Sequence, residues 1–324
     1  MLKRFVHRFR WPILFVAGFV LPLFLVYAAG QLYRRVDYRK QFAGLHGSPV
    51  ATEVTYVEET GGHRLYSIRI ENEFGVAVDG FLRVPPDEGG PYPALVLLGG
   101  VRTGRRTIEY VDNTRGVVLL ALDYPYDGKT GRMSAVEFAA AVPRIRQAVV
   151  RTVPAVMLAV DFLRARTDVD PDRIILVGGS LGALFAPAAA ATDTRIAAAA
   201  MLFGAGDLES LMRANLEMPG ILAGPASWLG AVLVSPVEPV KYVGSIAPRP
   251  VFMLNGTGDP RMPERNSRIL HEAAGDPKTI RWIDAGHVNI RDERFHAIVT
   301  RELTEWLVDR SLVSSRNVAR PEDE

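Results

Sequence analysis

The chain has 324 residues, of which 48% are hydrophobic, so it can form one large α/β domain or two small ones. Eight of its 38 Lys and Arg residues but only one of its 36 Asp and Glu residues lie in positions 1–40. The formal net charge of +2 therefore hides a body of about −5, which gives no electrostatic support for nucleic-acid binding. Cysteine is absent, which excludes disulfides, thiolate metal sites and cysteine nucleophiles.

The first forty residues predict a membrane anchor. Residues 11–33 carry no charge, and as a helix this run would extend roughly 34 Å, enough to cross a bilayer core. Basic clusters flank the run, and aromatic residues stand near both ends. A short basic N-terminus favours the cytoplasm, so we expect residues 1–40 to form a single-pass anchor with the body outside the cytoplasm. The alternative is a signal peptide cleaved after the small residues at 26–28 or 28–30, which would release a secreted protein.

Residues 41–312 predict one α/β domain whose sheet begins antiparallel. Alternating or β-branched runs predict an opening meander: Glu53–Glu58, Leu65–Ile70 and Val76–Val84. Short apolar runs predict buried parallel strands: Ala94–Leu98, Val117–Leu122, Arg173–Val177, Ile196–Phe203, Val251–Leu254 and Thr279–Ile283. The expected helices are Ser134–Arg166, with candidate breaks at Pro143 and Pro154, Leu181–Ala191, Glu264–Ala274 and Arg294–Asp309. This alternation predicts helices on both faces of a mostly parallel sheet.

Two segments lack this alternation. Residues 206–247 are rich in Leu, Met and Pro without an obvious strand, so we expect them to form a small helical cap or pocket wall. Residues 313–324 are polar and end in acidic side chains, which is typical of a disordered tail.

One segment contains the pattern G-x-S-x-G where a predicted buried strand meets a predicted helix. Ser180 would lie on the sharp turn, while Gly178 and Gly182 omit side chains that would collide there. The amide of Leu181, at the helix start, is a candidate oxyanion donor. An isolated pattern of this kind is often only a tight turn, but the strand before it and the helix after it favour a nucleophile.

On these residues the chain resembles the α/β-hydrolase superfamily, in particular its dienelactone-hydrolase and prolyl-oligopeptidase-like branch. The resemblance covers about residues 76–312. It rests on Gly178-Gly179-Ser180-Leu181-Gly182, on Ile246–Val251 leading into Asn255-Gly256-Thr257-Gly258-Asp259, and on Ala285-Gly286-His287. It implies hydrolysis of an ester, amide or related bond through an acyl-enzyme, with no cofactor, and we expect no metal.

A serine nucleophile needs a general base and a third group that orients the base. Of the six histidines, His287 alone sits in a loop after a late predicted strand, which favours it as the base. Asp259 also follows a late strand and gives the chain order Ser180, Asp259, His287 of this fold. Asp207 is the alternative acid, because some members of the fold carry the acid after the preceding strand.

The loop after residues 94–98 is the expected source of the second oxyanion donor. The amide of Val101 or of Gly100 is expected to fill this role, although the loop lacks the histidine often found at its start in this fold. Arg102 and Arg105 follow. Most such clusters are solvated, but as a hypothesis these side chains bind an anionic group of the substrate, because arginine can grip a carboxylate or phosphate with two hydrogen bonds.

These features favour a carboxylesterase that acts on a small-molecule ester, since it needs only the triad, two oxyanion amides and a cap. A lipase acting at the bilayer is a variant, suggested by the anchor and by the apolar region Pro219–Val234. A serine peptidase of the prolyl-oligopeptidase kind is an alternative, but residues 41–93 are too few for a gating propeller. A noncatalytic binding protein on this scaffold is a second alternative, disfavoured because all three reactive residue types stand in order. The natural substrate and the oligomeric state stay open.

Overall fold

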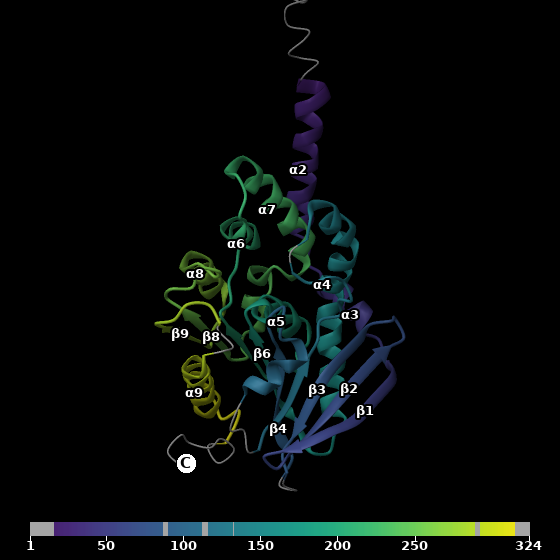
Figure 1. Cartoon of the computed structure of the whole chain (residues 1–324), viewed down its shortest axis with the longest axis vertical. Coiled ribbons are helices and arrows are strands. Elements are labelled where there is room, and N and C mark those ends of the chain that lie inside the picture. The colour runs from purple at the N-terminus through teal and green to yellow at the C-terminus, as the bar shows by residue number, and fades with distance from the viewer. Residues whose placement is uncertain (1–15, 87–89, 112–115, 132, 289–291, 315–324) are drawn as a thin grey trace, which may run out of the picture.

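The computed structural model describes residues 16–86, 90–111, 116–131, 133–288 and 292–314, and a mixed sheet of nine strands forms the centre of this part of the chain (Figure 1). The strand order is β1-β2-β3-β5-β4-β6-β7-β8-β9. Their bounds are β1 Pro49–Thr60, β2 His63–Asn72, β3 Ala77–Val84, β4 Tyr92–Leu98, β5 Val118–Leu122, β6 Val169–Gly179, β7 Ala198–Leu202, β8 Val251–Gly256 and β9 Lys278–Ile283. The strands from β1 through β3 to β5 pair antiparallel, and the remaining pairs are parallel. The predicted antiparallel start and parallel remainder are confirmed.

Burial along the strands follows from their place in the sheet. Strands β4, β5 and β8 are buried along their whole length, as expected for strands covered on both faces. Strand β3 alternates between buried and half-buried residues, so it presents one face to the core. Strand β1, at the edge, is exposed throughout. The parallel part of the sheet is therefore the most completely buried.

Helices cover both faces of the sheet. The α-helices are α2 Leu21–Arg34, α3 Arg39–His46, α4 Ala135–Arg164, α5 Leu181–Thr192, α6 Leu208–Asn215, α7 Gly220–Val234, α8 Glu264–Ala273 and α9 Glu293–Asp309. Buried side chains of α3, α4, α5 and α8 join the core on one face. The other face is covered by α9 and by the 3-10 helix η2, Gly104–Tyr110.

Helix α4 runs without interruption through Pro143 and Pro154, so the breaks that these prolines suggested are not found. Its start is fixed by a capping box, in which Ser134 Oγ accepts the N–H of Glu137 and the Glu137 carboxylate accepts the N–H of Ser134. An interior proline costs a helix roughly 3 kcal/mol. The long buried face of α4 against the sheet offsets this cost, which local sequence patterns do not reveal.

The described part of the predicted anchor consists of a π-helical turn η1, Val16–Val20, and helix α2, which projects from the body (Figure 1). Residues 1–15 lie outside the described residues. Within the described part of the chain, one helical stretch is long and apolar enough to cross a membrane, and it is internal: Gly220–Lys241, with 33% of its most apolar stretch buried. The N-terminal anchor therefore stays a prediction.

The segment expected to form the cap lies between β7 and β8. It contains α6, α7 and three 3-10 turns, which are η3 Ser235–Val237, η4 Pro239–Lys241 and η5 Val243–Ile246. Helices α6 and α7 lie on the same side of the sheet as the base of α2 (Figure 1). The predicted tail falls outside the described residues from 315 onward.

Candidate active site

Ser180 occupies a strained turn between β6 and α5. Its backbone angles are φ 53° and ψ −110°, which side-chain-bearing residues rarely adopt. A Cβ on Gly178 would overlap the backbone of Gly182, and a Cβ on Gly182 would overlap the carbonyl of Leu98. The two glycines therefore let the chain reverse sharply, and they bring the end of β4 against the start of α5.

Ser180, His287 and Asp259 form a continuous hydrogen-bonded chain. Ser180 Oγ is 2.8 Å from His287 Nε2, and His287 Nδ1 is 2.7 Å from Asp259 Oδ2. Because the carboxylate can only accept, Nδ1 carries the proton and Nε2 is left to accept the serine hydroxyl. The structure thus brings together the three residues that the sequence selected, and in the tautomer that lets histidine receive the serine proton.

The Asp259 carboxylate is held as an anion below the histidine. It is only 7% exposed, and Oδ1 accepts the N–H groups of Arg261 at 2.8 Å and Met262 at 3.0 Å. Burial opposes ionisation, but the hydrogen bonds from His287, Met262 and Arg261 together keep the pKa of Asp259 below its usual 3.8. The carboxylate can therefore orient the imidazole and stabilise its positive charge.

Asp207, the alternative acid, caps a helix. Its backbone is left-handed, with φ 54° and ψ 70°, and its side chain caps α6 by accepting the N–H of Ser210 at 3.3 Å. The N–H groups of Asp207 and Leu208 donate to the two carboxylate oxygens of Glu238, each at 3.0 Å. The residue that reaches His287 is Asp259.

The expected oxyanion loop is a tight turn after β4. Gly100 O accepts the N–H of Thr103 at 3.2 Å and that of Gly104 at 3.4 Å. The hydroxyl of Tyr124, which follows β5, donates to Gly99 O at 2.5 Å. Since β4 packs against the first turn of α5, the loop starts beside Leu181. Sequence reasoning missed Tyr124, although an aromatic residue directly after a buried strand is a usable signal.

The two arginines that follow this loop differ. Arg105 Nε is 2.6 Å from Asp123 Oδ2, its N–H donates to Asp123 Oδ1 at 2.7 Å, and its guanidinium lies over the Phe81 ring. Arg102 is exposed. Asp123 therefore competes with any substrate anion for Arg105. The exposed Arg102 stays a candidate for binding an anionic group of the substrate.

Aromatic rings pack against the His287 imidazole, and a buried polar pair lies near the end of β8. The Phe203 ring meets the His287 ring edge-on at 6.1 Å, and the ring of Phe295 packs on Phe203. Below β8, His271 Nε2 contacts Asn255 Oδ1 at 2.9 Å. Burial lowers the pKa of His271 to about 4, so this imidazole is neutral and structural. Sequence patterns assigned no supporting role to Phe203 or Asn255, because both look like ordinary strand-end residues.

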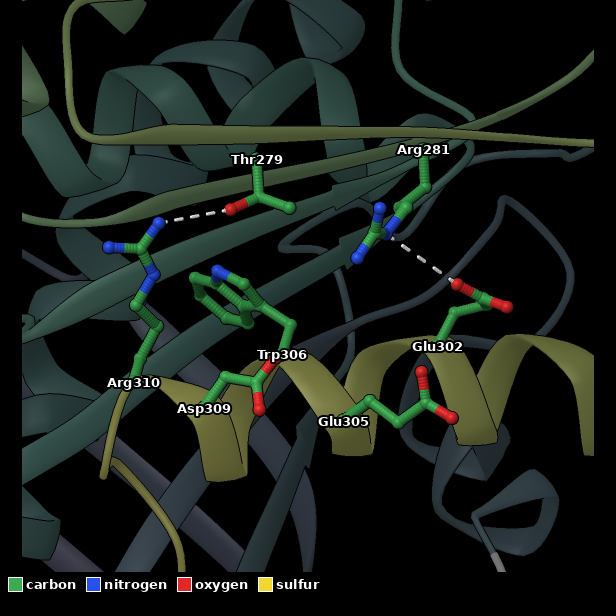
Figure 2. A pocket seen from close by; sticks show the side chains of 7 residues that line it. All are labelled: Thr279, Arg281, Glu302, Glu305, Trp306, Asp309 and Arg310. Carbon is green, nitrogen blue, oxygen red and sulfur yellow. Dashed lines mark hydrogen bonds and ion pairs between the residues drawn. The ribbon is translucent and has the colours of Figure 1, made fainter.

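A separate cavity of about 230 Å³ lies between β9 and α9 (Figure 2). It is lined by Thr279, Arg281, Glu302, Glu305, Trp306, Asp309 and Arg310. Arg310 donates to Thr279 Oγ1 at 3.2 Å, and Arg281 lies 3.9 Å from Glu302 (Figure 2). Its charged side chains face one another, and Ser180 is not among its lining residues.

Comparison with solved structures defines the class of protein. An acetyl xylan esterase from Paenibacillus sp. R4 superposes with a TM-score of 0.65 at 19% identity, covering 83% of this chain and 93% of that one. Acetyl xylan esterase 1 from Thermoanaerobacterium sp. JW/SL YS485 gives a TM-score of 0.59 at 16% identity, covering 85% and 98%. The fold is that of the α/β hydrolases, as the sequence predicted.

Sequence comparison then places the chain in a family. A sequence model of the prolyl oligopeptidase family matches residues 107–312, so the chain belongs to that family. Proteins named uncharacterized protein YfhR are similar over a shorter stretch. The protein from Escherichia coli O157:H7 is 28% identical over 145 residues, which is 44% of this chain and 48% of that protein. The protein from Salmonella typhi is 29% identical over 141 residues, covering 42% and 48%. The chain thus spans about half the length of the curated relatives it matches.

Proposed function

We propose that this hydrolase is a carboxylesterase that works through an acyl-enzyme on Ser180. The observation that carries the proposal is the unbroken chain from Ser180 Oγ through His287 to the Asp259 carboxylate. The solved structures with the same fold include esterases, which supports an ester as the substrate. The reaction needs only groups that the chain itself supplies.

The proposed mechanism has two halves. In the first, Ser180 Oγ attacks the ester carbonyl while His287 Nε2 takes its proton, and the protonated imidazole then donates that proton to the leaving alcohol. The amide of Leu181 and that of Gly100 or Val101 stabilise the negative oxygen of the tetrahedral intermediate. In the second half His287 takes a proton from a water that attacks the acyl group, and the imidazolium then returns that proton to Ser180 Oγ as the carboxylic acid leaves. Asp259 stays ionised and stabilises the imidazolium in both halves.

The test uses the full chain and its Ser180→Ala variant on nitrophenyl esters of graded acyl length. We expect turnover of short esters by the wild type, a loss of about 10³-fold or more in the variant, and labelling of Ser180 alone by a fluorophosphonate. Folding of the variant is checked by circular dichroism. If the wild type neither turns over any ester nor takes the label, the esterase proposal is wrong.

A peptidase is the second candidate, because the chain belongs to a family named for a peptidase. A panel of nitroanilide and internally quenched peptides, assayed beside the esters, separates the two. Peptide turnover with a kcat/KM above that of the best ester would replace the first proposal by the second. A thioester in the same panel tests the neighbouring chemistry.

We also propose that residues 11–33 anchor the protein in a membrane with the body outside the cytoplasm. The described part of this run supports the proposal, because α2 exposes large apolar side chains such as Leu23 and Phe24, each 62% exposed. We expect the full chain to resist extraction from membranes at alkaline pH. We also expect a single cysteine in place of Val57 to react with an impermeant maleimide added to intact cells. A soluble protein that begins near residue 29 or 31 would indicate a cleaved signal instead.

A further inference from the structure

Helix α7 has the reverse of the usual surface pattern. The residues that it buries against the body are small, Ala223, Ser227 and Ala231, whereas Ile221 is 85% exposed and Leu229 60% exposed. No charged residue occurs between Gly220 and Val234. A surface helix of a soluble protein normally turns polar residues outward. We call the exposed side chains of Met218, Ile221, Leu222 and Leu229 the apolar cap face.

This face continues onto the proposed anchor. The Trp228 ring of α7 packs on the backbone of Gly30, where a Cβ would overlap it, and its centre is 5.5 Å from that of Tyr27. Arg34, at the end of α2, forms an ion pair with Glu209 of α6. Helices α2 and α7 therefore lie side by side (Figure 1), and both carry exposed apolar side chains.

The contact between Trp228 and Tyr27 also indicates how deep α7 would lie in the membrane. Tyr27 precedes Tyr33, the end of the uncharged run, by six residues, or roughly 9 Å along the helix. Helices that lie in a membrane interface bury their apolar face about 5–10 Å into the boundary between headgroups and acyl chains. Helix α7 by itself has 15 residues and extends roughly 22 Å, which is too short to span a bilayer core. The longer apolar stretch Gly220–Lys241 continues through the 3-10 turns η3 and η4, and the buried residues of η3 return the chain to the body.

The active-site residues lie at the edge of the sheet from which the chain enters α6 and α7. Ser180, the loop at Gly100, Asp259 and His287 all follow the carboxyl ends of parallel strands, and the chain leaves that edge to form α6 and α7. Helix α4 also begins there, and its first turns expose Phe138 as well as Val136, which is 80% exposed. Exposed apolar side chains of α4 and of the cap therefore belong to elements that the chain enters from the edge that carries the reactive serine.

We propose that the apolar cap face rests in the lipid–water interface, so that the active site receives esters dissolved in the bilayer. This rests on the esterase function and the anchor proposed above. The occupant is the lipid surface, because the face adjoins a helix of membrane-spanning composition at interface depth. The substrate class is then an ester with a long apolar chain, delivered along α7 without passing through water.

Contact with lipid is tested on the full chain in vesicles of phosphatidylcholine and phosphatidylglycerol. Because the chain has no cysteine, Ile221→Cys carries a single fluorophore, and Val57→Cys on β1 is the matched control. Val57 is also an exposed apolar residue, and β1 runs away from the active-site edge. Brominated lipids should quench the label at 221 at least about threefold more than the label at 57.

Equal quenching at both positions would overturn the docking proposal. Disulfide cross-linking of Ile221→Cys between copies would also overturn it, because a second copy would then cover the face. These outcomes do not depend on catalysis, so the esterase proposal is judged separately by Ser180-dependent turnover of a soluble nitrophenyl acetate in the same vesicles.

Delivery of substrate is tested with the double variant Ile221→Glu/Leu229→Glu. Charges in the interface should lower its activity on a long-chain ester embedded in the vesicles by about fivefold or more, while its activity on nitrophenyl acetate stays that of the wild type. Equal loss on both esters would indicate a damaged cap, and no loss on either would remove the cap face from substrate delivery. Both results contradict the proposal.

Discussion

Two aspartates follow successive strands, and their hydrogen bonds predict opposite results from the same substitution. Asp259→Asn removes the anion below His287 and permits the wrong imidazole tautomer, so we expect kcat to fall by about 10³–10⁴-fold. Asp207→Asn keeps an N-cap side chain for α6, and asparagine caps helices as well as aspartate, so activity should stay near that of the wild type. Steady-state kinetics on the best ester measure both. A larger loss of kcat in Asp207→Asn than in Asp259→Asn would show that Asp207 is the catalytic acid.

We propose that Tyr124 positions the expected oxyanion loop. Its hydroxyl holds Gly99 O, and because a peptide unit is planar this also fixes the direction of the Gly100 N–H. We expect Tyr124→Phe to lower kcat about tenfold with little change in KM, since the amide is needed mainly in the transition state. Tyr126→Phe is the control, because the Tyr126 hydroxyl donates to Lys129 O at the surface. Equal kcat values for the two variants would remove this role from Tyr124.

At the scale of elements, the turn between β6 and α5 is crowded at Gly182 and open at Gly179. Gly182→Ala places a methyl group in the Leu98 carbonyl, and we expect it to lower the free energy of unfolding by roughly 2–3 kcal/mol. Gly179→Ala, in the same turn, meets its nearest atom only at 4.0 Å and should cost less than about 1 kcal/mol. Urea unfolding gives both values. Similar losses would mean that backbone crowding does not govern this turn.

We expect the stability of the protein to depend on pH because of His271 in helix α8. The folded protein keeps this histidine neutral down to its pKa of about 4, whereas the unfolded chain protonates it below about 6.5. The unfolded state therefore binds more protons in this window, and the free energy of unfolding falls as pH drops from 6.5 to 4. His271→Gln keeps a donor for Asn255 and should flatten that fall, as measured by urea midpoints at pH 7 and 5. An unchanged slope would place the pH sensitivity elsewhere.

Sequence patterns predicted those features that depend on residues close together in the chain. The nucleophile turn could be predicted because glycines at 178 and 182 flank the serine between a strand and a helix, and His287 and Asp259 followed from chain order. The continuity of α4 could not be predicted, because the burial that offsets Pro143 and Pro154 comes from strands distant in sequence. The pairing of Arg105 with Asp123 could not be predicted either, because it joins two loops that are 18 residues apart in the chain.

At the scale of the whole molecule, α2 and the residues that follow it contact the body at several points. Besides the Trp228 contact, Lys241 Nζ donates to Val36 O at 3.1 Å, and the N–H of Tyr38 donates to the Tyr242 hydroxyl at 3.3 Å. Burial lowers the pKa of Lys241 to about 8, as expected for an amine enclosed at such a junction. The junction is therefore a packed interface.

Gly30 gives a direct test of this junction. Gly30→Val would push the Trp228 ring away, so we expect a shifted tryptophan emission and faster proteolysis between residues 34 and 38. Ala29→Val changes the neighbouring exposed position and should leave both readings unchanged. Equal proteolysis of the two variants would show that the contact between α2 and α7 does not hold the junction together.

The exposed edge strand β1 has a consequence for solubility. A free strand edge can pair with the edge of another chain and begin aggregation. Strand β1 carries Glu53, Glu58 and Glu59, and its pairing with β2 shifts register between Pro49 and Ala51 and between Tyr56 and Glu58. Like charges would repel across two such edges, and irregular pairing twists an edge away from flat growth. The sheet can therefore end in water without seeding fibres.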